Sequence, residues 1–401
     1  MTLLVIVEQH MKQLANGEVW TYDMINSSFW ERYLNVFENV IVCGRIKQCS
    51  DNDTMGLAKS SHPNVVFVAM PDFRGVTGLI KNYVAIRKAI KKAIKMADCI
   101  IYRAPSPISM VAYPLVHRSK KPFALEFMLN PITMYSKSSS KSILQPLIQS
   151  IVTRQAYDMC QKANGVSYVT ERVLQELFPC RAMIDTNNSN YFTTYYSTIC
   201  LKKEDYTFMD MPKEVPKEIT IVHSGKMYDY RKGQDILIRA ISLLHNKNYN
   251  VKLTLLGNGT KRLEFENLAK HLGVDKYVLF EGWKTGYNSV QKVLQSGHIF
   301  AFPSYGEGLP RSVIEPMANS ILTIGSAVDG ILELLPNQLL VKDMTPEAYA
   351  NKIADIIDNW SEYMELRLEI YERSLQYENS ILSENRNMFY KRLKALCEKK
   401  Y

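Results

Sequence analysis

The chain has 401 residues, 46% hydrophobic and 22% charged, with a formal net charge of +9. This length exceeds one ordinary domain core and fits two domains, and the composition is globular. No segment approaches the roughly 20 consecutive apolar residues that cross a bilayer, and the seven scattered cysteines show neither metal-ligand spacing nor a disulfide framework.

The positive charge lies almost wholly in the first half. Residues 1–200 hold 22 Lys and Arg against 14 Asp and Glu, whereas residues 201–401 hold 27 against 26. A basic surface on the first domain suggests an anionic partner such as a phospholipid surface, a lipid pyrophosphate or nucleic acid, and a solvated basic face is the alternative. No basic stretch is interleaved with base-stacking aromatic residues, so we predict no nucleic-acid binding.

The opening run "LLVIV" is too short for a signal peptide, lacks a basic start and predicts a buried first strand. We therefore expect a cytoplasmic protein. Short Val-, Ile- and Phe-rich runs then alternate with helical segments, as in "NVIVCG", "CIIYRA" and "PFALEF" of the first half and "EITIVHSG", "VKLTLLG" and "HIFAFPS" of the second. This alternation indicates α/β architecture, with βαβ units and a parallel sheet in each half.

The domain boundaries follow from composition. Residues 206–218 belong to a polar stretch with prolines and little apolar periodicity, which predicts a linker. The expected divisions are a first Rossmann-like domain over 1–205, the linker over 206–218, a second Rossmann-like domain over 219–370, and a C-terminal helix over 371–401 that packs back on the first domain.

The segment 78–99 is helical in period and strongly basic. An apolar stripe faces one way, and Lys88, Lys91, Lys92 and Lys95 occupy the other side. A core helix with a solvated lysine face is one interpretation, and a face that rests on anionic lipid is the other.

Asp51, Asn52 and Asp53 match the D-x-D spelling of metal-binding transferases. They follow a polar stretch where a metal site of this kind would follow an apolar strand. We interpret them as a solvated loop and predict that no metal or other cofactor is required.

In the second half, an apolar strand ends at His223-Ser224-Gly225, and a loop with Lys226, Arg231 and Lys232 leads into a helix. A glycine and cations at the carboxyl edge of a strand suit a diphosphate, because the backbone can approach closely and the charge is balanced. A plain strand-loop-helix corner with surface lysines is the alternative.

Two further loops follow strands. Gly257 opens "GNG", which lacks the third glycine of a dinucleotide fingerprint, so hydride transfer is not indicated. Gly282 and Trp283 follow the next strand, where a backbone edge and a flat side chain could hold a base; Trp283 could equally be a packing residue.

The stretch "FPSYGEGLPRSVIEPMA", residues 302–318, reads as a strand end, a loop and a helix. Pro310 suits the first turn of that helix, and the free amides of Gly308, Leu309 and Arg311 would face an anion. Each of Glu307 and Glu315 can accept two hydroxyl hydrogens, which suits one to a sugar and the other to a ribose.

Five stretches in residues 219–360 resemble, in order, the retaining nucleotide-sugar glycosyltransferases of the GT-B fold, namely the group-one or family-four set. They are "HSGKMYDYRKG", "LLGNG", "FEGW", "FPSYGEGLPRSVIEPMA" and "TIGSAVDGILELL". The resemblance implies two Rossmann-like domains that face each other across a cleft. It also implies that Lys226 and Lys232 bind the diphosphate, Glu307 the transferred sugar and Glu315 the ribose.

The sequence departs from that pattern at two places: Lys226 stands where arginine is usual, and Asp329-Gly330 stands where two glycines are usual. The first half resembles the acceptor domains of bacterial members that build cell-surface polysaccharide, lipopolysaccharide or exopolysaccharide. Asn130 stands where many relatives carry aspartate or histidine, which leaves the general base unassigned, and His10 and Asn130 are candidates for acceptor binding.

These observations predict a retaining, metal-independent hexosyltransferase. It would move a sugar from a nucleoside diphosphate sugar to a hydroxyl of a lipid-linked glycan, as a cytoplasmic enzyme peripheral to the inner leaflet. Another GT-B enzyme, such as a phosphorylase or nucleotide-sugar epimerase, and a non-catalytic nucleotide-sugar-binding protein are the alternatives. The sequence does not specify the base, sugar, linkage, acceptor or oligomeric state.

Overall fold

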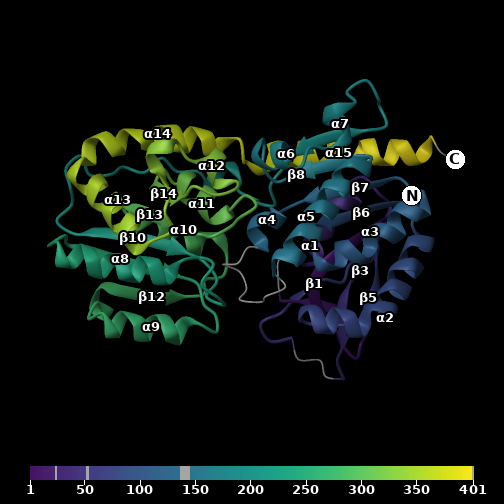
Figure 1. Cartoon of the computed structure of the whole chain (residues 1–401), viewed down its shortest axis with the longest axis horizontal. Coiled ribbons are helices and arrows are strands. Elements are labelled where there is room, and N and C mark those ends of the chain that lie inside the picture. Colours follow the sequence, from purple (N-terminus) through teal and green to yellow (C-terminus); the bar gives the residue numbers. More distant parts are fainter. Residues whose placement is uncertain (23–24, 51–53, 136–144, 400–401) are drawn as a thin grey trace. The chain divides into compact units, whose positions relative to one another are not determined.

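The computed structural model describes residues 1–22, 25–50, 54–135 and 145–399. These divide into two compact units (Figure 1). The first unit comprises Met1–Ile132, Pro146–Tyr196 and the chain from Leu382 onward, and the second comprises Thr133–Gln145 and Ser197–Ile381. Residues 51–53, which are predicted to be a solvated loop, lie outside the described residues.

The first unit contains a parallel sheet in the order β5-β3-β1-β6-β7-β8-β9, in which β2 and β4 extend the end of β1 in antiparallel fashion. Its strands are β1 (Thr2–Gln13), β2 (Val19–Thr21), β3 (Asn39–Gln48), β4 (Ala58–Lys59), β5 (Val65–Met70), β6 (Cys99–Ala104), β7 (Phe123–Phe127), β8 (Gly165–Tyr168) and β9 (Phe192–Tyr195). Its helices are α1 (Ser27–Leu34), α2 (Gly75–Met96), α3 (Pro107–Ser119), α5 (Gln145–Lys162), α6 (Val173–Leu177) and α7 (Arg181–Ile184). Helix α4 (Pro131–Met134) spans the boundary, since Thr133 and Met134 belong to the second unit.

The second unit contains a parallel sheet in the order β12-β11-β10-β13-β14-β15. Its strands are β10 (Ile219–Ser224), β11 (Val251–Leu256), β12 (Val278–Gly282), β13 (Ile299–Phe302), β14 (Leu322–Ser326) and β15 (Leu340–Val341). Its helices are α8 (Gln234–Asn246), α9 (Arg262–His271), α10 (Tyr287–Gln295), α11 (Arg311–Met317), α12 (Ile331–Leu334), α13 (Pro346–Asp358) and α14 (Trp360–Leu375).

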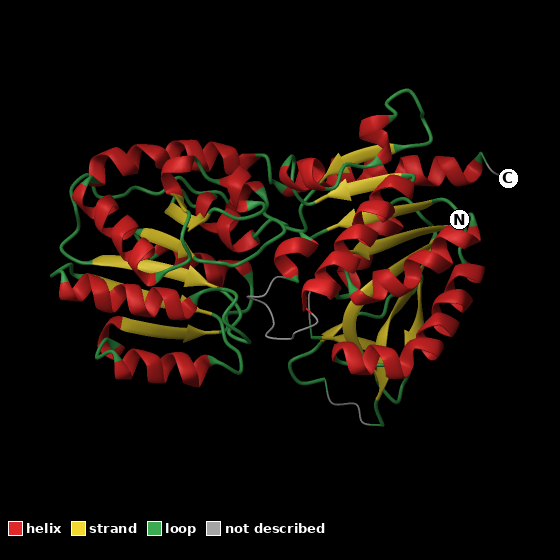
Figure 2. Ribbon diagram, in the orientation of Figure 1, coloured by secondary structure: helices red, strands yellow, loops and turns green. Residues whose placement is uncertain are grey.

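Both sheets are doubly wound, with helices packed along them (Figure 2). The central strands read as near-continuous apolar runs because helices cover both faces of such a sheet. Every residue of β6, β7 and β13 is buried. The strand order reverses between β1 and β6 in the first unit and between β10 and β13 in the second, and ligands of doubly wound sheets bind at such switch points.

The C-terminal helix α15 (Asn379–Glu398) packs within the first unit from Leu382 onward. Tyr390 donates a hydrogen bond of 2.6 Å to the buried carboxylate of Glu126, which also accepts hydrogen bonds from Tyr33 and Tyr196. Arg103 lies 3.2 Å from the same carboxylate. The buried charge is therefore paired and hydrogen-bonded, as stability requires.

The predicted linker 206–218 packs on α14 of the second unit. The Trp360 indole donates to the carbonyl of Pro212 at 2.9 Å, the Tyr206 hydroxyl donates to the carbonyl of Ser374, and Phe208 lies edge-on to Tyr371. The first unit already ends at Tyr196, before the expected boundary at residue 205. Leu201 accounts for part of the difference, because it is buried and forms a parallel bridge with Glu378 of the second unit.

Helix α2 covers the predicted basic segment. Its buried residues are Ile86, Ile90, Ala93 and Ile94, and Lys88, Lys91, Lys92 and Lys95 are all exposed. Tyr83 has the helical spacing of the apolar stripe, three residues before Ile86, yet it is exposed, together with Val76, Ile80 and Val84. Across the described residues, we find no helix with the length and hydropathy needed to traverse a bilayer.

Candidate active site

A cavity of about 400 Å³ lies at the switch point of the second unit. Loops after β10, β11, β12 and β13 contribute to its lining together with the start of α11, so residues distant in sequence converge there. The lining residues are Thr198, Ser224, Gly225, Lys226, Lys232, Leu256, Gly257, Trp283, Lys284, Val290, Glu307, Leu309, Pro310, Arg311, Ser312 and Glu315.

The glycines of the first two loops allow two backbones to touch. A side chain at Gly257 would place its Cβ 2.1 Å from the carbonyl oxygen of Gly225, and Gly257 has a φ of +132°. The Gly225 amide donates to Leu256 at 2.9 Å, and the Gly257 amide donates to Gly282 at 2.9 Å. Only glycine fits such a contact, which lets the two loops approach each other at the ends of β10 and β11.

Lys232 and Glu307, to which the family resemblance assigns different parts of a ligand, form an ion pair. The side chain of Lys232 is 28% exposed and that of Glu307 is 11% exposed. The same Glu307 oxygen accepts a 2.6 Å hydrogen bond from Ser304. An ammonium group has three hydrogens, so Lys232 can hold Glu307 and a phosphate oxygen at once.

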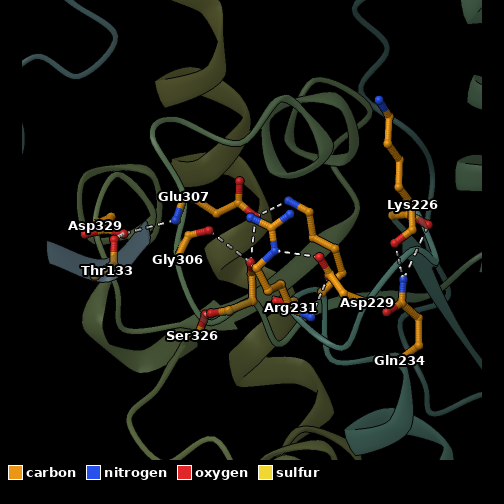
Figure 3. Close-up of polar contacts among 12 residues, drawn as sticks. Thr133, Lys226, Asp229, Arg231, Gln234, Gly306, Glu307, Ser326 and Asp329 are labelled. Carbon is orange, nitrogen blue, oxygen red and sulfur yellow. Dashed lines mark hydrogen bonds and ion pairs between the residues drawn. The ribbon is translucent and has the colours of Figure 1, made fainter. Parts of the chain in front are cut away.

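The other loop lysine remains apart from this pair. Lys226 is exposed, and Figure 3 shows its side chain extended, with the ammonium group away from the Glu307 contacts. Gln234 donates to the carbonyl of Lys226 at 3.3 Å and thereby ties the loop to the start of α8.

Asp329 fixes the backbone of Glu307. Its Oδ2 accepts hydrogen bonds from the Glu307 amide at 3.0 Å and from the Thr133 hydroxyl at 2.7 Å (Figure 3). Asp329 is buried and has a φ of +44°, a left-handed conformation that disfavours most side chains. The neighbouring Gly330 donates to the carbonyl of Gly308 at 3.1 Å, so two consecutive residues brace the loop that carries Glu307.

Glu315 faces the cavity from α11, and burial raises its pKa from 4.5 to about 7, while Arg311 opposes the shift. Burial disfavours a carboxylate that has lost its water. Hydroxyl groups of a ligand would restore hydrogen bonds to the charged form.

The helix that carries Glu315 begins at Arg311, as expected, but Pro310 precedes its first turn and does not form part of it. Pro310 has an extended conformation and occupies the N-cap position, so the first helical residue is Arg311. The helix spans only seven residues, so its dipole is small, and the cations of the cavity supply more of the positive charge. The correction follows from ψ of Pro310, which is 114° where a helical residue has about −42°.

Arg231 does not line the cavity. Its guanidinium pairs with Asp229 at 2.8 Å on an exposed part of the loop, while its carbonyl accepts hydrogen bonds from Ser304 and Tyr305. The predicted donor residues Gly282 and Gly308 also lie outside the lining. They act on the site through the backbone, as the contacts with Gly257 and Gly330 show.

Trp283 is 60% exposed at the mouth of the cavity. This exposure excludes a core packing role, which was one of the two interpretations of this side chain. Lys284, the next residue, pairs with Glu281 at 2.6 Å.

Sequence reasoning missed several lining side chains, including Thr198, Lys284, Val290, Arg311 and Ser312. Arg311 does carry a signal in the sequence, because it is a cation at the expected start of the helix, directly after Pro310. Thr198 carries no signal in the sequence, since it lies about 20 residues before the predicted start of the second domain at residue 219 and no motif surrounds it.

His223 packs against the loop that follows β10 and against β13. It is fully buried and stacks on Phe302 with ring centroids 5.6 Å apart, and Nδ1 lies 2.9 Å from the carbonyl oxygen of Ala301. Burial lowers its pKa to about 4. The neutral ring therefore packs against Gly225. A Cβ added at Gly225 would lie 2.9 Å from Nε2 of His223.

The two acceptor candidates lie in the first unit. Asn130 is buried, and its Oδ1 accepts a 2.9 Å hydrogen bond from the Ile132 amide at the start of α4, which is a structural role. His10 is half-buried near the end of β1 and pairs with Asp72. Within the described ranges, no group of three or more His, Cys, Asp or Glu side chains is placed to hold a metal ion.

Comparisons with known proteins agree with this architecture. Residues 218–359 match the sequence model of the glycosyl transferases group 1 family. Protein CapJ of Staphylococcus aureus is 23% identical over 78% of this chain and 76% of its own length.

Two solved structures share the fold over nearly their whole length. Sucrose-phosphate synthase of Thermosynechococcus elongatus superposes with a TM-score of 0.71 at 16% identity, covering 99% of this chain and 100% of that one. HepE of Anabaena, solved with UDP and glucose, gives 0.63 at 14% identity, covering 100% and 99%. The predicted two-domain α/β architecture is confirmed: the chain has the GT-B fold, and its residues 218–359 match the group 1 glycosyltransferases.

Proposed function

We propose that the protein transfers a sugar from a nucleoside diphosphate sugar, with retention of configuration, to a hydroxyl of a lipid-linked glycan in cell-surface polysaccharide synthesis. The observation that carries this proposal is the cavity in the second unit. Its cations Lys226, Lys232 and Arg311 suit a diphosphate, and its carboxylates Glu307 and Glu315 suit hydroxyl groups.

In the proposed mechanism, Lys226 and Lys232 stabilise the negative charge that the diphosphate gains as the glycosidic bond breaks. Glu307 holds a hydroxyl of the transferred sugar near the anomeric carbon, and its link to Lys232 sets the distance between sugar and phosphate. Glu315 accepts the ribose hydroxyls. The cavity carries no side chain assigned as a covalent nucleophile, so we favour same-face attack in which the leaving phosphate accepts the acceptor proton.

Uridine diphosphate is the donor nucleotide that we propose. The support is that HepE, which has the same fold, was solved with UDP and glucose. A thermal-shift panel of uridine, guanosine, adenosine and thymidine diphosphates tests it, because a ligand at 100 times its dissociation constant stabilises by about 2.7 kcal/mol. A larger shift with another diphosphate would reassign the base.

The decisive experiment measures transfer and donor hydrolysis by Lys232→Ala and Glu307→Ala with the donor that the panel selects. Each change should reduce turnover by about 100-fold or more, because each removes charge stabilisation at the reacting centre. The matched control is Lys252→Ala, which breaks a surface pair with Glu218 in the same unit. Near-normal turnover in both site variants would contradict the proposal.

The products distinguish the alternatives. A phosphorylase or epimerase would convert the donor without extending a glycan, and a binding protein would bind the diphosphate without transfer or hydrolysis. The anomeric configuration of the new bond, read by NMR, tests retention. Full activity in the presence of EDTA is expected, because the proposed charge stabilisation comes from lysines and requires no metal.

We also propose that α2 holds the protein at the cytoplasmic leaflet. Exposed Val76, Ile80 and Val84 are spaced by four residues and so share one side of the helix. The four exposed lysines of the same helix follow. Apolar side chains beside cations are typical of helices that lie on anionic membranes.

Co-sedimentation with vesicles that contain phosphatidylglycerol tests this surface. Neutralising Lys88, Lys91, Lys92 and Lys95 to Gln should abolish most binding, since each cation contributes about 1 kcal/mol near an anionic surface. The control neutralises four exposed lysines of the second unit, Lys213, Lys270, Lys276 and Lys292. Equal binding by the two variants would refute the proposed role of α2.

A further inference from the structure

The switch point of the first unit carries a second set of polar side chains. His10 of β1 pairs in register with Arg45 of β3, and Arg45 pairs with Met70 of β5. Asp72 follows Met70 by two residues, so three neighbouring strands bring these side chains to one edge of the sheet. The β1–β3 register shifts between Ile6 and His10, and such irregularities commonly re-aim side chains at functional sites.

Arg45 contacts both segments that carry His10 and Asp72. Its Nε donates to the carbonyl of Glu8 at 2.8 Å, and its Nη1 donates to the carbonyl of Phe73 at 3.1 Å. Glu8 is two residues from His10, and Phe73 is adjacent to Asp72. The Arg45 side chain, which is only 10% exposed, thus holds the backbone near His10 and near Asp72. These contacts pre-organise the His10–Asp72 pair.

The hydrogen bond from His10 to Asp72 assigns a hydrogen to Nδ1 of His10. A carboxylate can only accept, so Nδ1 carries the hydrogen that His10 donates to Asp72. In the neutral ring Nε2 is then an acceptor. The His10 side chain is 36% exposed and that of Asp72 is 28% exposed, so a ligand can reach both.

The same edge disfavours an anionic ligand. Helix α3 begins here, and Glu8 accepts the Ile108 amide at 3.1 Å, so the chain's own carboxylate occupies the amino end of that helix. Asp72 adds a second carboxylate, and Arg45 is already paired with Glu8 at 2.9 Å. Carboxylates at this edge repel an anion, which favours a neutral ligand rich in hydroxyl groups.

We infer that His10 and Asp72 form a binding site for the acceptor sugar, in which Nε2 of His10 accepts a hydrogen bond from a sugar hydroxyl. His10 contacts the ligand, and Asp72 is a positioning residue that fixes the ring. This inference rests on the proposed function, because it takes the first unit to bind the acceptor.

The test uses the full chain and saturation-transfer NMR with the methyl glycosides of glucose, galactose and N-acetylglucosamine as probes. At least one probe should bind the wild type, and His10→Phe should lower its signal about fivefold or more, the loss expected for a hydrogen bond worth about 1 kcal/mol. His10→Gln, which keeps an acceptor near the position of Nε2, should retain part of the signal. His62→Phe changes a histidine of the same unit outside the site and should match the wild type.

A spectroscopic measurement keeps the inference testable if a variant fails to fold. In wild-type protein, the ¹⁵N shift of His10 Nε2 should be that of an unprotonated acceptor and should move when the glycoside is added; Asp72→Asn should reduce both features. An unshifted Nε2 resonance, an equal signal from His10→Phe, or no binding of any glycoside by the wild type would each overturn the inference.

UDP stabilisation separates this inference from the proposed function. His10→Phe should keep the wild-type thermal shift with UDP, because the cavity belongs to the second unit. Failure of the wild type itself to bind UDP would count against the proposed function, whereas normal UDP binding with unaltered glycoside binding in His10→Phe would overturn only the assignment of His10.

Discussion

The two units use the same sheet topology but present opposite charge at their switch points. In the second unit the loops after β10 and β13 bring Lys226, Lys232 and Arg311 to a cavity. In the first unit the corresponding place holds Glu8 and Asp72, with Glu8 bonded to the start of α3. The fold supplies the location of a ligand, and the side chains near the carboxyl ends of the strands decide its charge.

The largest expected effect concerns backbone packing at the second switch point. Gly330→Ala would place a Cβ 2.1 Å from the carbonyl oxygen of Gly308, and neither backbone atom can rotate away. We expect the free energy of unfolding in urea to fall by about 3 kcal/mol or more. Gly17→Ala, in the open hairpin of the first unit, has a φ of +84° but meets nothing within 4 Å, so only about 1 to 2 kcal/mol of stability should be lost to backbone strain.

The next prediction concerns the ion pair between Lys232 and Glu307 in the cavity of the second unit. Glu307→Gln should lower turnover by about 100-fold, because the sugar loses its charged partner. The same change frees Lys232 from its ion pair, so UDP should bind about fivefold more tightly by calorimetry. Glu8→Gln is the matched change at the first switch point and should leave UDP affinity unaltered; weaker UDP binding in Glu307→Gln would contradict the role of the pair.

A smaller effect tests Asp329 as a positioning residue. Asp329→Gly removes the acceptor for the Glu307 amide while relieving the positive φ, so stability should change by less than about 0.5 kcal/mol. Turnover should fall about tenfold with little change in UDP affinity. Asn248→Gly changes another residue of positive φ, 64°, which is exposed, and should keep full turnover. Unchanged turnover in Asp329→Gly would show that Gly330 suffices to hold the loop.

The smallest effect is a pH dependence. Burial raises the pKa of Glu315 to about 7 in the folded protein, so the folded state keeps a proton that the unfolded state releases near pH 4.5. The resulting stabilisation is complete below pH 4.5 and is lost as pH rises through 7, by about 1.4 kcal/mol for each tenfold fall in proton concentration between these values. The difference in unfolding free energy between wild type and Glu315→Gln should therefore change over this interval; a constant difference would exclude a raised pKa.

Much of the site could be read from the sequence because glycines, cations and carboxylates at strand ends keep their positions in any parallel sheet. The loop glycines Gly225 and Gly257, the lysines and both glutamates all converge on one cavity. Arg231 has the same charge as Lys232 and lies next to it, yet it turns outward to Asp229. A loop's local geometry decides which of two adjacent cations faces the ligand, and spacing alone does not encode it.

The sequence by itself determined the α/β class, the two parallel sheets and the residues from which a donor site could be built, because hydrophobic periodicity and strand-end chemistry are local properties. The tertiary structure decided which of those residues touch: Lys232 with Glu307, Asp329 with the Glu307 amide, and His10 with Asp72. These pairs lie 75, 22 and 62 residues apart in the chain. Contacts of that range depend on how strands are ordered in a sheet, and strand order arises only when the whole core packs.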